Sequence, residues 1–277
     1  MRRLGVALLA LAAAACYAPR VDLQRTYHPS DADMSITRIV HGAVILDFRG
    51  TRILVDPWYS PTPPLGPGEA IGIAPDKLPS VRGILLTHDH NDHFDSRTLS
   101  VLPDKTVKVV VPKGLGEDVK ELGYTDVVEM EPWERTQIAD VVVSSVPARH
   151  RVPENGYILQ ANGVTTYLAG DTSFDPPLFW SIVEGFPKID VAILPIGGIR
   201  ILGRKLDMNS DEAARAFGIL KPDRVIPYHY ALIGPFPLVY SPSEPEADFE
   251  EAMKERHPEK ADAVVRLAPG ESWHYYK

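Results

Sequence analysis

The chain has almost no cysteine, no long hydrophobic run and no surplus of positive charge. Cys16 is its single cysteine, so an internal disulfide is excluded, and the body of the chain has no thiol to serve as nucleophile or metal ligand. The 29 Lys and Arg residues face 37 Asp and Glu residues, which gives a formal net charge of −8. Because nucleic-acid binders usually present a basic stripe, this balance predicts no nucleic-acid partner.

The apolar run Leu4–Ala15 is too short to cross a hydrocarbon core of about 30 Å. It follows Arg2 and Arg3 and ends at Cys16, an order typical of a signal peptide. Ala13-Ala14-Ala15-Cys16 also resembles a bacterial lipobox, in which the cysteine is lipidated. We therefore expect residues 1–15 to be a lipoprotein-type signal peptide and Cys16 to anchor the protein to a membrane of the cell envelope. The alternative is simple cleavage near Ala15.

The rest of the chain divides into a tether and one folded domain. Residues 16–34 begin with the lipidated cysteine and are polar, proline-containing and aperiodic, which predicts a tether. Residues 35–277 alternate strand and helix patterns, which favours a layered α/β domain. The predicted strands cover residues 36–40, 43–48, 52–55, 83–87, 107–111, 141–146, 157–160, 165–169, 191–195, 223–226 and 263–267. The predicted helices cover residues 96–102, 115–122, 178–184, 210–220 and 244–256.

A cluster of metal-ligand residue types directly follows the predicted strand 83–87. Burying so many imidazoles and carboxylates together would leave polar groups unpaired or desolvate charge, which is costly. A divalent cation removes this cost, because neutral imidazoles donate nitrogen lone pairs and carboxylates neutralise the charge. The sequence therefore predicts a metal site that contains His88, His90, Asp92 and His93.

The string His88-x-His90-x-Asp92-His93 resembles the signature of the metallo-β-lactamase superfamily. The resemblance implies an α/β fold of four layers, an αββα sandwich, with metal ions at one edge of its sheets. It also implies three more ligands that follow strands in a fixed order. Pro147-Ala148-Arg149-His150, Ala169-Gly170-Asp171-Thr172 and Pro227-Tyr228-His229-Tyr230 match that order. Each residue alone has an ordinary explanation, as a loop, turn or core residue. All three in the expected order, each after a predicted strand, argue against coincidence.

The superfamily pattern assigns these ligands to two ions, and assigns catalytic roles to Asp92 and Asp171. One ion is held by His88, His90 and His150, the second by Asp92, His93 and His229, and Asp171 bridges the two. A hydroxide bound by two divalent ions attacks an ester-type bond without a protein nucleophile, because the ions lower the pKa of water to about 7. Nitrogen and oxygen ligands make zinc the default, with manganese or iron as alternatives.

Further strings are similar to one branch of the superfamily, which contains ascorbate-phosphate lactonases and phospholipases D that hydrolyse N-acylphosphatidylethanolamine. They are Val40-His41-Gly42-Ala43, Ile53 to Trp58, Leu194 to Gly198 and Met208 to Ala213. The resemblance implies that His41 lies near the site and has a catalytic role, as a substrate contact or a proton carrier. The alternative is a histidine in a strand without a role in the site. Asp56 either orients a ligand histidine or forms a turn. Asp207 stands where phospholipase-like members carry histidine.

These features predict a metal-dependent hydrolase that acts on a small-molecule or lipid substrate, with a phosphodiester favoured. The apolar, proline-rich stretch 234–240 directly after His229 suits a lipid. A lactonase or another carboxylic ester hydrolase is the first alternative. The second is a non-catalytic metal-binding envelope protein, although a scaffold has no physical need for seven metal ligands.

Overall fold

The computed structural model describes residues 27–277. The predicted signal peptide, Cys16 and the tether as far as residue 26 lie outside the described residues. The last residues of the predicted tether contact the domain, since the Asp33 carboxylate accepts a hydrogen bond from the Lys277 amide (2.9 Å) and the Arg52 guanidinium lies 5.3 Å from the centre of the Tyr27 ring. No helix within residues 27–277 is long and apolar enough to cross a membrane.

The first sheet has seven strands in the order β18-β1-β2-β3-β5-β6-β7. Strands β1, β2 and β3 form antiparallel hairpins, whereas β3, β5, β6 and β7 run parallel to one another. Arg49 and Gly50 both have positive φ (49° and 98°) in the turn between β2 and β3, the backbone twist that suits a two-residue hairpin. The strands are β1 (Met34–Val40), β2 (Ala43–Phe48), β3 (Thr51–Val55), β5 (Gly83–Leu85), β6 (Lys108–Pro112), β7 (Asp126–Met130) and β18 (Ser272–Tyr275).

The second sheet has six strands in the order β15-β12-β11-β10-β9-β8. Its β8 to β11 half is antiparallel, whereas β11, β12 and β15 run parallel. The strands are β8 (Arg135–Ile138), β9 (Val141–Pro147), β10 (Asn155–Ala161), β11 (Val164–Leu168), β12 (Val191–Pro195) and β15 (Arg224–Tyr228).

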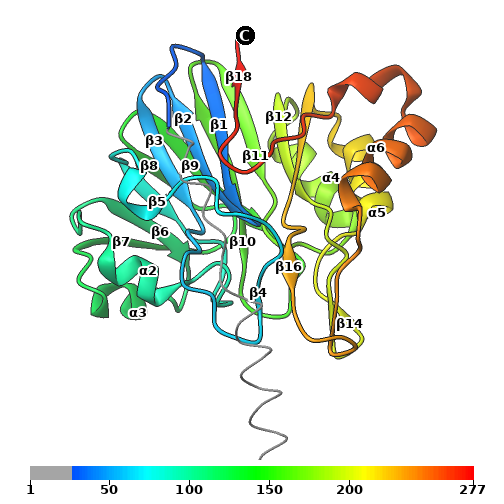
Figure 1. Cartoon of the computed structure of the whole chain (residues 1–277). Helices are drawn as coiled ribbons and strands as arrows, with labels where there is room; N and C mark the ends of the chain where they lie inside the picture. Colours follow the sequence, from blue (N-terminus) through cyan, green and yellow to red (C-terminus); the bar gives the residue numbers. More distant parts are fainter. Residues whose placement is uncertain (1–26) are drawn as a thin grey trace, which may run out of the picture.

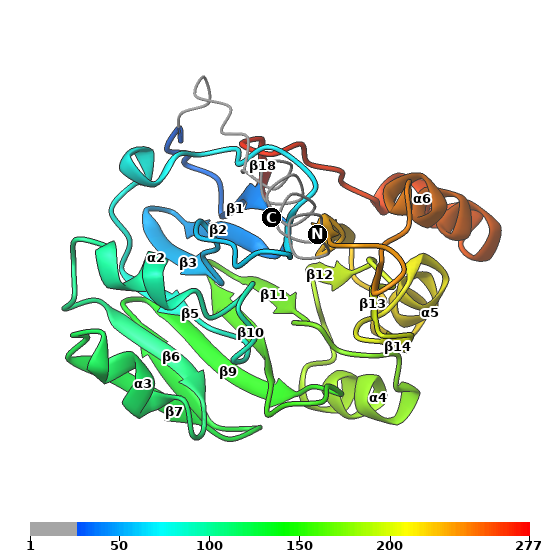
Figure 2. The same cartoon turned by 60° about the horizontal axis from the view of Figure 1, so that its bottom comes forward.

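The two sheets face each other, and helices cover both outer faces, so the predicted αββα sandwich is confirmed (Figures 1 and 2). Side chains of both sheets, among them Leu46, Phe48, Tyr157 and Ile193, form the central core. Two short helices, α2 (Ser96–Val101) and α3 (Gly116–Glu121), cover the first sheet. The second sheet is covered by α4 (Pro176–Gly185), α5 (Ser210–Leu220) and α6 (Pro245–Arg256).

The predicted strand at 263–267 is wrong. Residues Pro258–Ala263 form a 3-10 helix, and Val264 makes only an isolated bridge to Val225. The chain then leaves the second sheet and ends as β18 beside β1 in the first. To cross between the sheets the chain has to turn out of its extended conformation. Pro269 and Gly270 make this turn, in which Gly270 has a positive φ. Strands β7, β8 and β18 were not predicted, because each is short and partly exposed.

Short strands extend the domain on the side where the metal-ligand motifs end. A three-stranded sheet has the order β14-β13-β17, and a second small sheet pairs β16 with β4. The strands are β13 (Arg200–Ile201), β14 (Arg204–Lys205), β17 (Val239–Tyr240), β4 (Gly66–Pro67) and β16 (Leu232–Ile233).

Candidate metal centre

Four segments that follow strands of both sheets meet at one edge of the sandwich. The β5 strand leads into the His88–His93 loop, and β9 leads to His150. The β11 strand leads to Asp171, and β15 leads to His229. The structure thus brings together all seven predicted ligands, and His41 lies beside them in the turn between β1 and β2.

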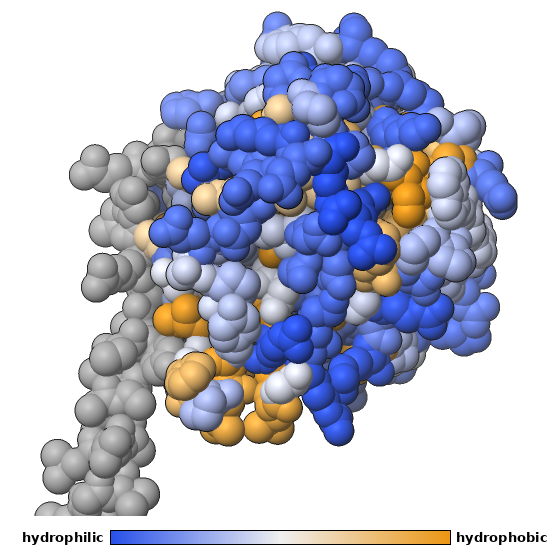
Figure 3. All heavy atoms as spheres, turned by 90° about the vertical axis from the view of Figure 1, so that its right-hand side faces the viewer, coloured by the Kyte–Doolittle hydropathy of each residue, from blue (hydrophilic) through white to orange (hydrophobic). Residues whose placement is uncertain are grey.

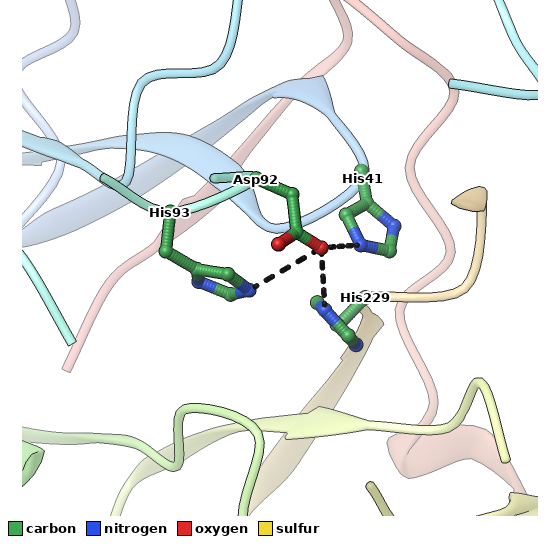
Figure 4. Close-up of side chains that lie close together, drawn as sticks. All are labelled: His41, Asp92, His93 and His229. Carbon is green, nitrogen blue, oxygen red and sulfur yellow. Dashed lines mark hydrogen bonds and ion pairs between the residues drawn. The ribbon is translucent and has the colours of Figure 1, made fainter. Parts of the chain in front are cut away.

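The ligand atoms form two neighbouring clusters. In each cluster one ligand atom from every member lies within 4.8 Å of the others: His88, His90, His150 and Asp171 form the first, and His41, Asp92, His93 and His229 the second. Figure 4 shows the second cluster, with its three imidazoles turned toward the Asp92 carboxylate. Asp171 faces both clusters, because its Oδ2 atom lies 3.0 Å from His229 Nε2, 3.3 Å from His93 Nε2 and 3.7 Å from His88 Nε2.

Asp56 and Thr87 fix the ring orientation of two ligand histidines from behind. The buried Asp56 carboxylate accepts from the Thr87 amide (2.9 Å), the Thr87 hydroxyl (2.7 Å) and His93 Nδ1 (2.8 Å). The Thr87 hydroxyl donates its proton to Asp56, so Oγ1 of Thr87 can accept a hydrogen bond from His88 Nδ1 (3.0 Å). Nδ1 of each ring is therefore a donor, and Nε2 is turned toward the site, where it would bind a metal ion once it is unprotonated. Of the two roles that the sequence leaves open for Asp56, its contacts therefore favour the one in which it orients a ligand histidine.

The other two rings are held in the same way by different elements. His229 Nδ1 donates to Asp207 Oδ2 (2.9 Å), and the second oxygen of Asp207 accepts from the Ile199 amide (2.8 Å). His150 Nδ1 donates to the Leu206 carbonyl (3.2 Å). Residues 199–207, which contain the β13–β14 strand pair, thus support a ligand of each cluster.

Several buried polar atoms of the site make no well-formed hydrogen bond. Among the described residues they are the Nε2 atoms of His88, His93 and His229 and the Oδ1 atom of Asp171. The Nε2 atoms of His229 and His93 face Oδ2 of Asp171 only as ion pairs. An unsatisfied buried polar group costs about 1–3 kcal/mol, so four at one place need an explanation. Lone pairs of nitrogen and oxygen that converge on one space fit a divalent cation. The residues present therefore fit the metal that the sequence predicts.

His41 has the opposite tautomer from the ligand histidines. Its Nδ1 atom accepts a hydrogen bond from the Ala231 amide (3.1 Å), so Nε2 carries the proton and donates to Asp92 Oδ2 (3.3 Å). A protonated Nε2 has no lone pair for a metal, so His41 positions Asp92 rather than serving as a ligand. Burial and the neighbouring His229 lower the pKa of His41 to about 3, which keeps the ring neutral. The role of His41 as a substrate contact or proton carrier stays a prediction.

Glu154 is a site residue that the sequence reasoning missed. It is buried, and its Oε1 atom accepts the Asp171 backbone amide. Burial, reinforced by Asp171, raises the pKa of the Glu154 carboxyl well above its usual value. A Cβ atom at residue 170 would collide with Oε1, and Gly170 has φ of 69°, so glycine is required there. The available signal was an acidic residue four positions after His150, directly before a buried strand.

Three residues of the site have left-handed backbone conformations that non-glycine residues rarely adopt. The φ angles are 50° at His41, 43° at Asp56 and 54° at His229. Each such residue costs on the order of 1–3 kcal/mol, and such strain is concentrated at functional sites. The His229 amide also donates to the His41 carbonyl (3.1 Å), so the two strained turns hold each other in place.

The electrostatics of the centre favour bound positive charge. Burial alone would lower the pKa values of His93 and His229, but neighbouring carboxylates, Asp171 first, raise both well above the usual value. Burial alone would likewise raise the pKa of Asp171, but His229 and His93 lower it well below its usual value. In the metal-free chain, protons on the imidazoles therefore balance the carboxylates, and a metal ion takes their place when it binds.

The chain is similar in sequence to a known family and in fold to solved structures. A family model described as a beta-lactamase superfamily domain matches residues 51–230. A metal-dependent hydrolase of Pyrococcus furiosus is 34% identical over 251 residues, which cover 86% of this chain and 98% of the relative. Two solved structures share the fold at low identity. The diiron β-hydroxylase CmlA of Streptomyces venezuelae has a TM-score of 0.70 at 22% identity, over 89% of this chain and 55% of its own. Igni18, a metallo hydrolase of Ignicoccus hospitalis, has a TM-score of 0.66 at 21% identity, over 88% and 99%.

The chain belongs to the metallo-β-lactamase superfamily. Within it, the matched relatives form the UPF0173 family of metal-dependent hydrolases, so this chain is a metal-dependent hydrolase. The narrower resemblance to the lactonase and phospholipase branch stays a prediction.

Proposed function

We propose that this hydrolase cleaves a phosphodiester bond of a membrane phospholipid at a centre of two divalent metal ions, with zinc as the expected metal. The observation that carries the proposal is an exposed apolar surface that directly adjoins the ligand-bearing segments. This surface, called the apolar rim below, consists of Leu202, Ile233, Phe236, Leu238 and Tyr240.

The apolar rim is a built feature rather than a set of scattered side chains. The β13 and β17 strands pair, and the Leu202 amide donates to the Leu238 carbonyl (2.7 Å). Phe236 is 81% exposed and Leu202 70% exposed. Figure 3 shows hydrophobic surface gathered at the lower edge of this face, next to strongly hydrophilic surface. Contiguous exposed apolar surface with a polar border marks an interaction site.

The rim is attached to the metal centre at both of its ends. On one side, Leu206 and Asp207 follow β14 and contact His150 and His229. On the other side, β16 begins three residues after His229. Arg200 and Arg204 are exposed on the same strand pair and supply positive charge for an anionic lipid surface. A lipid bound here would keep its hydrocarbon chains against the rim and place its headgroup at the metal ligands.

The chain's own residues prepare the site for hydrolysis. Two divalent ions held by these ligands would lower the pKa of a bound water and stabilise charge that develops on the substrate oxygen. His41 holds Asp92, whose side chain is 17% exposed, at the open side of the second cluster. The buried side is closed by His88, His93 and Asp171, whereas His90 and His150 are partly exposed like Asp92. Solvent and substrate would therefore arrive from the side of these three residues.

The same proposal places the protein at a membrane. Lipidation of Cys16 would tether residues 27–277 to the envelope, and Cys16→Ser should move the protein from the membrane to the soluble fraction. Unchanged membrane association of Cys16→Ser would remove the anchor from the proposal.

The direct test is headgroup release from phospholipid vesicles by the zinc-loaded chain, with Asp171→Ala as the inactive control. Release by the wild-type chain alone would support a lipid phosphodiesterase. If the wild-type chain holds metal and releases no headgroup, lactones and soluble carboxylic esters become the substrates to assay. If it holds metal and turns over none of these substrates, the alternative of a non-catalytic metal-binding envelope protein is favoured.

A further inference from the structure

Residues 66–72, called the strap below, connect the turn between β1 and β2 with the segment that follows β15. At one end β4 pairs with β16, as Figure 1 shows, and the Gly68 amide donates to the Ala231 carbonyl (2.5 Å). At the other end the Gly72 amide donates to the Ile39 carbonyl (2.8 Å). The strap therefore holds together two segments that each adjoin one of the strained turns of the metal centre.

Glu69 is the only charged residue of the strap, and its side chain is mostly buried, with 19% exposed. Its Oε1 atom accepts two hydrogen bonds, one from Arg38 Nη2 (2.6 Å) and one from the His41 backbone amide (2.9 Å). Hydrogen bonds to an ionised carboxylate are stronger than those between neutral groups. One oxygen of Glu69 thus ties the strap to the backbone of the turn that carries His41.

Arg38 is fully buried, so its charge has to be balanced within the protein. Glu69 supplies the negative charge, and Arg38 Nη1 donates to the Leu267 carbonyl (3.1 Å). The guanidinium also lies 4.4 Å from the centre of the ring of Tyr230, the residue directly after the last metal ligand. The Arg38–Glu69 ion pair therefore contacts both strained turns, the first through Glu69 and the second through Arg38.

The position of His41 matters to the second cluster because this residue contacts two of its ligands. His41 Nε2 donates to Asp92 Oδ2 (3.3 Å), as Figure 4 shows, and the His41 carbonyl accepts the His229 amide (3.1 Å). The φ angle of His41 is 50°, a conformation that persists only where surrounding contacts enforce it. Because Glu69 binds the amide of this same residue, it acts directly on the strained backbone.

We propose that Glu69 is a positioning residue for the second metal ion, since it fixes the His41 turn and through it the ligands Asp92 and His229. The inference rests on the two-ion centre of the proposed function and is independent of the substrate. It assigns a role in metal binding to the strap, which carries no metal ligand itself.

The first cluster should not depend on Glu69, because other elements orient its histidines. His88 Nδ1 lies 3.0 Å from the Thr87 hydroxyl, and His150 Nδ1 lies 3.2 Å from the Leu206 carbonyl. Removal of the Glu69 carboxylate is therefore expected to affect one ion and leave the other in place.

Titration of the metal-free full chain with cobalt(II), followed by visible absorption, tests the proposal. We expect two binding steps in the wild-type chain, and His229→Ala identifies the step that belongs to the second cluster. Glu69→Ala should weaken that step about tenfold, the lower end of the effect of residues that support metal ligands. The other step should be unchanged.

Glu69→Gln separates positioning from fold stability. Arg38 and the His41 amide donate to the same oxygen of Glu69, and glutamine keeps one such acceptor but carries no charge. Glu69→Gln should therefore unfold at lower urea concentration, because buried Arg38 loses its counter-charge, yet bind the second ion almost as the wild-type chain does. If Glu69→Gln weakens the second step as much as Glu69→Ala, the proposal is wrong.

Asp47→Ala is the matched control at the other end of β2. The buried Asp47 carboxylate accepts the Gly50 amide (2.6 Å) and pairs with Arg52 (3.2 Å), so it supports a turn as Glu69 does. This variant should lose stability and keep both binding steps. An unchanged second step in Glu69→Ala, equal weakening of both steps, or the same weakening in Asp47→Ala would overturn the proposal. A single step in the wild-type chain would contradict the two-ion centre itself, and the inference with it.

Discussion

The Nδ1 atom of His229 lies 2.9 Å from Oδ2 of Asp207, a fully buried carboxylate. Asp207 connects the last metal ligand to the strand pair that carries part of the apolar rim, since its other oxygen accepts the Ile199 amide. Burial raises the pKa of Asp207 to about 6, although its hydrogen bond to His229 opposes this shift. Carboxylates that orient metal-binding histidines commonly contribute a factor of 10–100 to metal affinity.

Asp207→Asn should therefore weaken zinc binding about 10–100-fold. Both oxygens of Asp207 accept hydrogen bonds, and an amide offers only one acceptor, so either His229 or the Ile199 amide would face an NH₂ group. Competition with a chelator measures the change. Asp211→Asn, at an exposed carboxylate paired with Arg256, is the control and should bind zinc normally. Wild-type affinity in Asp207→Asn would show that His229 needs no support from this residue.

Asp56→Asn should lower both metal affinity and the stability of the metal-free chain. Asp56 accepts three hydrogen bonds from Thr87 and His93, and the substitution disrupts this buried network. The expected loss in the free energy of unfolding is about 1–3 kcal/mol, measured by urea denaturation in the presence of a chelator. Thr87→Val removes only the hydroxyl and should have the smaller effect. Full stability of Asp56→Asn would contradict the network described for this site.

The affinity for metal should fall as the pH is lowered. The pKa values of His93 and His229 are raised well above the usual value by Asp171, so both imidazoles lose protons before a metal ion can bind. In the metal-free fold, the same raised pKa values contribute stability below the unfolded pKa of about 6.5, and this stability is lost as the pH rises through the folded values. Titration with zinc in buffers of different ionisation enthalpy should show proton release. Binding without proton release would refute this electrostatic account.

Charging the apolar rim should reduce hydrolysis of lipid in vesicles but leave the metal centre intact. Phe236→Asp and Leu238→Asp place carboxylates at exposed positions, where little folding stability is lost but insertion into a lipid surface is opposed. Trp180→Asp, at an exposed aromatic residue on α4, is the matched control. Headgroup release from vesicles, vesicle binding by sedimentation and zinc content are the three measurements. Unchanged vesicle binding in the rim variants would exclude the rim as the lipid contact.

The convergence of the predicted metal ligands could be foreseen from the sequence better than any other part of the site. Because each follows an apolar strand, the strand pattern and the ligand residue types together placed them at one edge. Asp207 and Glu154 could not be found in this way, since each acts through a contact distant in sequence: 22 residues separate Asp207 from His229 and 17 separate Glu154 from Asp171. The tautomer of His41 likewise depends on the Ala231 amide, 190 residues away.

Among the secondary structure elements, the long apolar strands and the capped helix α5 follow local pattern. Strand β18 does not, because Ser272–Tyr275 is partly exposed and exists through its pairing with β1, more than two hundred residues earlier. Residues 263–267 show the opposite. Their apolar sequence has strand propensity, but only Val264 pairs with the sheet, through an isolated bridge to Val225. Tertiary pairing decides both outcomes.

The central claim is that Asp171 joins two metal ions into one hydrolytic centre. It is tested most directly by measuring the zinc retained per chain after dialysis, together with turnover of an activated phosphodiester, for the wild-type chain and Asp171→Ala. We predict two zinc ions per wild-type chain, weakened retention of both in the variant, and no turnover by the variant. Two retained ions and undiminished turnover in Asp171→Ala would contradict the claim.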